Sequence, residues 1–170
     1  MAVPLFFNTI EESGLSTWLR ESDSFFGFYT ILIFHAVGMI LLAGLSTVID
    51  LRLLGVAPGI PLAPLKPWFK VMWLGFWINA VSGIFLVIAY PTKAFTNWDF
   101  YLKLTLIGLG VWTMQKIRTT VFGDLSLSEA AIAAKGRTLA IISLVLWTGV
   151  VTAGRFLAYT YIYITYGRQG

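Results

Sequence analysis

The sequence predicts an all-α integral membrane protein, a bundle of four transmembrane helices preceded by a short amphipathic helix at the membrane interface. Two observations predict this fold. Hydrophobic residues make up 58% of the 170-residue chain and charged residues only 12%, whereas a soluble domain has about 25% charged residues. Four segments are also long and apolar enough to cross a hydrocarbon core of ~30 Å, which takes about 20 helical residues. We therefore expect lipid to surround the chain.

The chain is predicted to form one domain in which short polar connections separate the spans. The connection over 50–67 is rich in proline and cannot be a continuous helix. That over 91–99 is a tight turn, and that over 123–136 has the composition of a short surface helix. The four expected spans cover residues 25–49, 68–90, 100–122 and 138–161.

The segment over 8–20 mixes Ile10, Leu15, Trp18 and Leu19 with acidic and hydroxyl residues. This pattern predicts a short amphipathic helix that lies on the membrane surface. The same region lacks the basic start of a secretory signal peptide, so we do not expect it to be cleaved.

Basic residues indicate the orientation of the chain. Seven Lys and Arg lie at the 50–67 and 123–137 connections and their flanking helix ends, and three lie on the opposite side. Because cytoplasmic loops carry the excess of basic residues, both termini are predicted to be periplasmic in a bacterial inner membrane. The net charge of +4 is spread beside the spans, which does not indicate nucleic-acid binding. The seven are Arg52, Lys66, Lys70, Lys116, Arg118, Lys135 and Arg137, and the three are Arg20, Lys93 and Arg168.

Polar residues inside a membrane are candidates for function because they are costly there. His35 lies about 15 Å from the outer end of the first span, and Asn79 is near the middle of the second, so the two can face each other. Gly75, Asn79 and Gly83 form one small face on which a neighbouring helix can pack closely. His35 is either a cofactor ligand or proton-carrying group, or a neutral imidazole bonded to Asn79 or to a backbone carbonyl.

Cofactor chemistry is restricted by composition. Without cysteine, the chain has no disulfide, thiolate metal site, iron–sulfur cluster or covalently attached heme. With a single histidine, a heme would have to be shared with a partner or use a His/Met pair. His35 and Met39 are four residues apart on one helical face, and imidazole and thioether ligands suit Cu(I). Met72 and Met114 lie at comparable depths, although Met in a bundle is usually packing material.

Two basic residues fall inside the predicted spans. Lys103 is close enough to the outer end of its span to extend its ammonium outward. Arg155 shares a helical face with Thr148 and Thr152 near the outer surface, where it can bind an anion or a quinone carbonyl. The alternative is that Arg155 anchors the helix at the interface, paired with Asp99. At the other end of the first span, Asp50 and Arg52 are expected to form local caps or ion pairs.

Several short strings, spread in order over nearly the whole chain, carry a resemblance to known proteins. They are Trp18-Leu-Arg-Glu-Ser22, His35 with Gly38, Asp50-Leu-Arg-Leu-Leu-Gly55, Phe100 with Lys103, and Trp147 followed by Gly154-Arg155 and Ala158-Tyr159. With these strings the chain resembles a family of small bacterial four-helix membrane proteins known only as a domain of unknown function. That family is distantly similar to copper-resistance D-type proteins and to di-heme b-type membrane cytochromes. The resemblance implies electron transfer or metal handling at the membrane, with His35, Lys103 and Arg155 as matched positions. The chain lacks the several histidines that bind heme in such relatives.

Three functions are consistent with these features. The first is a small non-catalytic subunit or accessory protein of a larger, redox-related membrane complex, with lipid and other membrane subunits as its partners. The second is a membrane electron carrier, linked to quinone or heme, that uses His35. The third is a copper or small-solute transporter. An enzyme is disfavoured because the sequence shows no nucleophile–base set, metal-ligand cluster or phosphate-binding loop.

Overall fold

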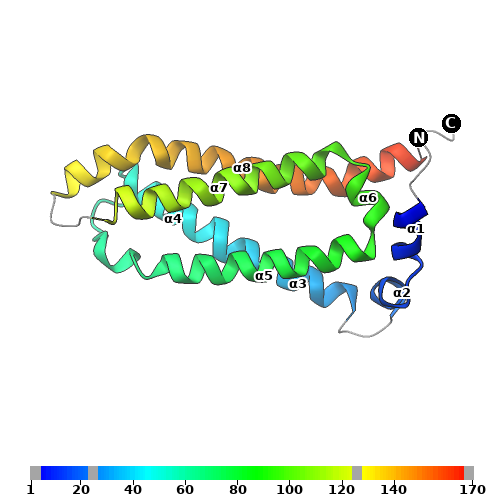
Figure 1. Ribbon diagram of the computed structural model, residues 1–170. Helices are drawn as coiled ribbons and strands as arrows, with labels where there is room; N and C mark the ends of the chain where they lie inside the picture. The colour runs from blue at the N-terminus through cyan, green and yellow to red at the C-terminus, as the bar shows by residue number, and fades with distance from the viewer. Residues whose placement is uncertain (1–4, 23–26, 124–127, 167–170) are drawn as a thin grey trace.

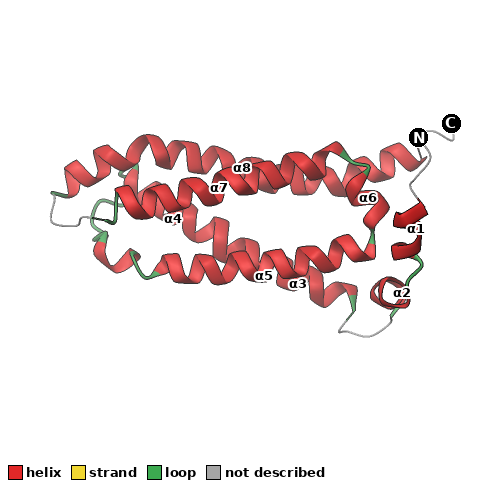
Figure 2. Ribbon diagram, in the orientation of Figure 1, coloured by secondary structure: helices red, strands yellow, loops and turns green. Residues whose placement is uncertain are grey.

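A computed structural model describes residues 5–22, 27–123 and 128–166, and within these ranges the chain is helical and contains no strand (Figure 2). The all-α prediction is confirmed for this part of the chain. Residues 25 and 26 of the expected first span, part of the expected surface helix over 123–136, and Arg168 lie outside the described residues.

Three helical stretches are long and apolar enough to cross a membrane: Phe28–Leu53, Ala63–Ala89 and Ala134–Leu157. They confirm a multi-pass membrane protein. The predicted count of four is not confirmed, because α7 (Trp98–Thr120) has the length of a span but not the hydropathy of the other three. Its sequence includes four charged side chains, at Asp99, Lys103, Lys116 and Arg118.

The first span is divided into three helical segments rather than the single helix predicted over 25–49. These are α3 (Phe28–Met39), a π-helical turn η1 (Ile40–Gly44) and α4 (Leu45–Leu53). In Figure 1, α3 lies beside α5 (Trp68–Ala89), and α4 lies among the helices on the other side of the bundle. The wide turn of η1 therefore lies where the span changes partners, and π-turns inside α-helices often mark functional sites.

The remaining long helices form an antiparallel pair, in which α7 packs along α8 (Glu129–Tyr166). The described end of the expected surface segment belongs to α8, which begins nine residues before the predicted start of that span. The connection predicted over 50–67 begins with the last residues of α4 and then contains a short 3-10 turn, η2 (Ala63–Leu65). A one-turn helix, α6 (Pro91–Phe95), joins α5 to α7 where a turn was predicted.

Two short helices cover one end of the bundle (Figure 1). They are α1 (Leu5–Glu11) and α2 (Gly14–Glu21), in place of the single helix predicted over 8–20. The break occurs because Ser13 caps the second helix, its side chain accepting from the Ser16 amide. We call the half of the bundle next to α1 and α2 the proximal half, and the opposite half the distal half.

Arg20 attaches these short helices to the bundle. Its guanidinium donates to the carbonyl oxygen of Ala89 at 2.9 Å and to that of Glu11 at 2.8 Å. Ala89 is the last residue of α5, whose final carbonyls have no partner within the helix. Arg20 therefore caps α5 from outside and fixes α2 against its end.

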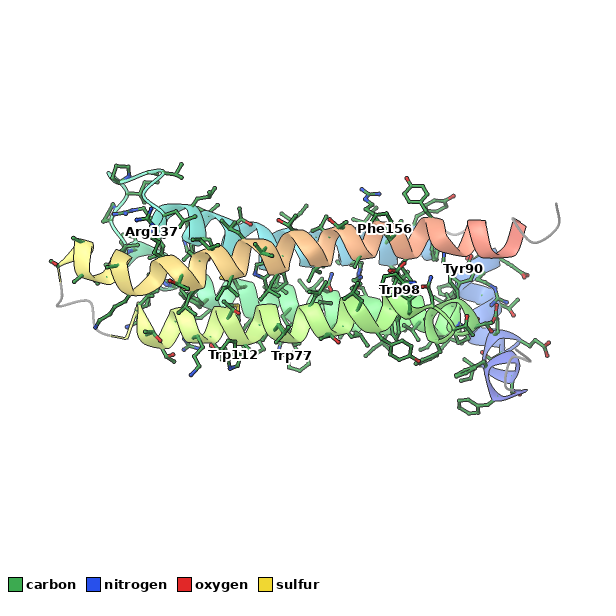
Figure 3. The ribbon with its side chains drawn as sticks, turned by 90° about the horizontal axis from the view of Figure 1, so that it is seen from above. Trp77, Tyr90, Trp98, Trp112, Arg137 and Phe156 are labelled. Carbon is green, nitrogen blue, oxygen red and sulfur yellow. The ribbon has the colours of Figure 1, made fainter. Side chains whose placement is uncertain are left out.

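The hydrophobic core lies mostly in the distal half, whereas large apolar side chains cover the outside of the bundle. Trp77 and Trp112 project from the helix surfaces (Figure 3) and are 60% and 55% exposed. Aromatic side chains exposed to this extent fit a surface in contact with lipid. The largest core residues are Leu42, Ile49, Phe69, Met72, Met114, Ile117, Val121, Phe122 and Trp147.

Candidate functional site

His35 of α3 lies against α5 in the proximal half. Its Nδ1 is 3.1 Å from the carbonyl oxygen of Asn79 and 3.1 Å from the hydroxyl oxygen of Ser82. A carbonyl oxygen can only accept, so Nδ1 carries the hydrogen of a neutral imidazole and donates it there. The other ring nitrogen, Nε2, then presents a lone pair.

Lys103 of α7 provides the contact to that lone pair. Its Nζ is 3.3 Å from Nε2 of His35, and both side chains are half-buried. The ammonium therefore points into the bundle, toward the imidazole, rather than along its helix to the outer surface. This contact joins α3 to α7 across the proximal half.

Asn79 holds His35 in place through the backbone as well. The side-chain Nδ2 of Asn79 donates to the backbone carbonyl oxygen of His35 at 2.7 Å, and the backbone carbonyl oxygen of Asn79 accepts from the imidazole. The helices come close enough for this because glycines face each other: a Cβ on Gly38 would lie 2.6 Å from the Asn79 amide nitrogen, and one on Gly75 would lie 2.7 Å from Cβ of Leu41. The small face predicted on the second span thus lies in the α3–α5 contact.

Two further glycines leave space around the histidine and the lysine. A Cβ on Gly83 would lie 3.3 Å from Cε1 of His35, and a Cβ on Gly154 would lie 3.7 Å from Nζ of Lys103. A Cβ at position 83 would press on the ring, whereas one at position 154 would make ordinary van der Waals contact with Lys103. We call His35, Asn79, Ser82 and Lys103 the proximal cluster.

The arrangement does not fit a metal ion or a heme iron at His35. Nδ1 is bonded to Asn79 and Ser82, and Nε2, the nitrogen with a free lone pair, faces the ammonium of Lys103. Met72 and Met114 are each 1% exposed in the distal core, where they serve as packing. Within the described residues, no three His, Cys, Asp or Glu side chains are grouped as metal ligands.

Arg155 is not part of the proximal cluster. It is exposed on α8, and the α8 residue next to Lys103 is its neighbour Gly154. Met39 lies one turn beyond His35 on the same helix and lines the groove described next.

An apolar groove of about 390 Å³ runs between the first span and α8. We call it the η1 groove, because residues of the π-helical turn line it together with residues of α3, α4 and α8. A second cavity, the α7 groove, is about 560 Å³ and lies between α7 and α8. The η1 groove is lined by Met39, Ile40, Gly44, Thr47, Val151 and Thr152, among others, and the α7 groove by Leu102, Leu106, Val145, Gly149 and Phe156, among others.

A second set of polar residues, missed by the sequence analysis, lies in the distal half between α4 and α8. Trp147 Nε1 donates to Ser46 Oγ at 3.0 Å, and Ser46 Oγ lies 3.2 Å from Ser143 Oγ and 3.5 Å from Oδ2 of Asp50. Asp50 is 0% exposed, and its Oδ1 has no hydrogen-bond partner in the part of the chain that the structure describes. We call these four residues the distal cluster.

The distal cluster changes the interpretation of Asp50 and Arg52. They were expected to form local caps or ion pairs, but Asp50 faces α8, and Arg52 Nε donates to the carbonyl oxygen of Ile60. The signal available in the sequence was the spacing of Ser46 and Asp50, four residues apart on one helical face. Likewise, Ser82 follows Asn79 by three residues and shares its face.

Comparison of the chain with protein-family models, with curated proteins and with solved structures found no match. The resemblance noted from the sequence therefore stays a prediction.

Proposed function

We propose that the protein is a small accessory subunit of a redox-related complex in a bacterial inner membrane, with the proximal cluster as its functional centre. In this proposal the chain crosses the membrane four times and both termini are periplasmic. The resemblance to four-helix membrane proteins that are distantly similar to b-type cytochromes supports the same class of function.

The fourth crossing is supported by the length and the packing of α7. Its 23 residues span about 34 Å at 1.5 Å per residue, which matches a hydrocarbon core of ~30 Å. It packs along α8, which is apolar enough to cross. Asp99, Lys116 and Arg118 lie near its ends, where charge is tolerated, and the remaining charge, Lys103, contacts His35.

The contact between Lys103 Nζ and His35 Nε2 is the observation that carries the functional centre. Asn79 and the glycines already join α3 to α5 without any charge. A lysine directed into the bundle adds a cation at membrane depth, which is costly and is usually retained for function. Together the two groups offer one N–H donor and one lone-pair acceptor at the same point, the combination needed to bind a polar group or to pass a proton.

The subunit role is supported by the few groups for catalysis that the described residues contain outside the proximal cluster. The connections between the described helices are short. Ser82 lies beside His35, but its hydroxyl donates to the Ile78 carbonyl and the imidazole nitrogen that faces it carries a hydrogen, so the two are not arranged as nucleophile and base. Ser46 and Asp50 are buried in the core. The cluster therefore acts on a molecule or a proton that a larger assembly uses. Copper transport finds no support in the environment of His35.

Purification of the tagged protein in a mild detergent tests this proposal. We expect larger membrane proteins with redox cofactors to copurify in fixed ratio. Lys103→Met should retain the assembly but lower its electron-transfer rate, whereas Arg155→Met, which alters an exposed charge outside the cluster, should affect neither. Recovery of the wild-type chain only as a monomer free of partners and cofactors would contradict the proposal.

A further inference from the structure

We infer that the proximal cluster and the η1 groove together form a binding site for an isoprenoid quinone, with the ring at His35 and Lys103 and the chain in the groove. This inference rests on the proposed function for its biological setting, but the site itself is argued from geometry.

The polar pair and the groove are neighbours on two helices at once. On α3, His35 precedes Met39, a lining residue of the groove, by one helical turn. On α8, Gly154, which adjoins Lys103, follows the lining residue Val151 by about one turn. Since α3 runs away from α2 and α8 runs toward that end, both steps lead from the groove into the proximal half. On both helices the lining of the groove therefore stops within about one helical turn of the polar pair.

The two polar groups match both redox forms of a quinone ring. Lys103 Nζ can donate to a quinone carbonyl, and the lone pair on His35 Nε2 can accept from the hydroxyl of the quinol. The hydrogen bonds on Nδ1 hold the imidazole in the tautomer that offers this lone pair. A ligand oxygen placed between the two nitrogens would take over the contact that they make with each other.

The groove itself suits a hydrocarbon chain. Two of its three threonine hydroxyls are engaged: Thr47 Oγ1 donates to the Ala43 carbonyl at 2.8 Å, and Thr152 Oγ1 donates to the Thr148 carbonyl at 2.8 Å. Trp147 Nε1 donates to Ser46. The walls thus present little unsatisfied polarity to an occupant, which favours an apolar one.

The depth of the polar pair favours a quinone over a phospholipid. His35 is seven residues inside α3, which corresponds to about 10 Å from the helix start. A phosphate head group would carry its charge to this depth at high cost, whereas a quinone ring is neutral.

Binding of two quinones to the purified protein in nanodiscs tests the site. Decylubiquinone carries a ring and a chain, and duroquinone carries a ring without a chain. Ile40→Trp fills the η1 groove, and Val145→Trp is its matched control in the α7 groove, since both side chains are 66% exposed. Lys103→Met removes the donor to the ring, and Lys103→Arg retains a cation. Empty nanodiscs correct for partition into lipid, and thermal unfolding verifies that each variant is folded.

We expect Lys103→Met to raise the Kd of both quinones by about tenfold, the effect of losing a hydrogen bond from a charged group. Ile40→Trp should raise the Kd of decylubiquinone by a similar factor and leave that of duroquinone unchanged. Val145→Trp should change neither, and Lys103→Arg should retain most of the binding.

An unchanged Kd in folded Lys103→Met, or equal effects of the two tryptophan variants, would overturn the site. If quinone binding fails in this way while redox proteins still copurify with the chain, only the quinone assignment is wrong and the proposed complex is retained. Quinone binding by a chain that copurifies with nothing would instead remove the proposed complex and leave the site standing.

Discussion

The two polar clusters of the bundle differ in accessibility and in how completely their atoms are paired. In the proximal cluster, His35 and Lys103 are half-buried, and each imidazole nitrogen has a neighbour. In the distal cluster, Asp50 and Ser143 are both 0% exposed, and one carboxyl oxygen of Asp50 has no partner among the described residues.

This difference teaches that a polar residue at membrane depth is not by itself a functional site. The distal cluster is enclosed by the hydrophobic core and joins α4 to α8, so its main effect is on packing. The proximal cluster lies one helical turn from the η1 groove along α3 and holds a donor and an acceptor on half-buried side chains. The distal cluster borders the same groove only through Trp147, whose indole nitrogen is already bonded to Ser46. Accessibility together with chemical complementarity, rather than polarity, distinguishes the two.

The largest expected effect concerns the backbone contact on which the proximal cluster depends. Gly75→Ala would place a Cβ 2.7 Å from Cβ of Leu41 and 2.9 Å from the carbonyl oxygen of Gly38. We expect it to lower the free energy of unfolding in detergent by about 3 kcal/mol, because packed helices cannot absorb such an overlap. Gly108→Ala is the control, since nothing lies within 4 Å of its added Cβ. Equal stability of the two variants would contradict the close α3–α5 packing.

A pair of serine substitutions compares the clusters directly. Ser46→Ala leaves Trp147 Nε1 and Ser143 in the buried cluster without their shared partner, so we expect a loss of about 2 kcal/mol. Ser82→Ala should cost less than about 1 kcal/mol, since His35 Nδ1 still donates to the Asn79 carbonyl. Thermal and denaturant unfolding in the same detergent give both values. A larger loss for Ser82→Ala would reverse the comparison.

Lys103→Met should affect stability little, although it is expected to affect function strongly. The ammonium is half-buried, and its removal leaves His35 bonded to Asn79 and Ser82, so we expect a change of less than about 1 kcal/mol. Unfolding curves of the variant and of wild type test this directly. A severe loss of stability would show that Lys103 holds the bundle together and would weaken its assignment as a binding group.

The smallest expected effect is at Gly154. Its added Cβ would lie 3.7 Å from Cε and Nζ of Lys103, an ordinary van der Waals distance. Gly154→Ala should therefore leave stability unchanged or raise it by up to about 1 kcal/mol, because alanine favours the helix. A marked decrease in the melting temperature would indicate that Lys103 lies closer to α8 than described.

Much of the fold was predictable because span length is set by the membrane. The second span was expected over 68–90 and is α5, Trp68–Ala89, and the helix is bounded on both sides by proline. The sequence also allowed the prediction that His35 and Asn79 face each other, since the depth of a residue follows from its position along each helix. The same arithmetic does not show which helix lies beside which.

Two of the missed features, at Lys103 and at Asp50, depend on that neighbour relation. Lys103 was expected to extend outward, but its direction is determined by the acceptor on α3, a helix far from it in sequence. Asp50 was expected to act locally because Ser143, on α8, is 93 positions away along the chain. The short break between α1 and α2 is different, since Ser13 is a recognisable capping residue and the division could have been found.

Because of the π-helical turn η1, the two α-helical segments of the first span are rotated about the helix axis independently of each other. Residues before it face α5 and residues after it face α8. Because each residue advances a helix by about 100°, deleting one position from the wide turn would swing the Ser46–Asp50 edge away from its present neighbour while His35 kept its own. The first span thus packs against two different helices, and the π-helical turn between its segments determines how the proximal and distal clusters are oriented relative to each other.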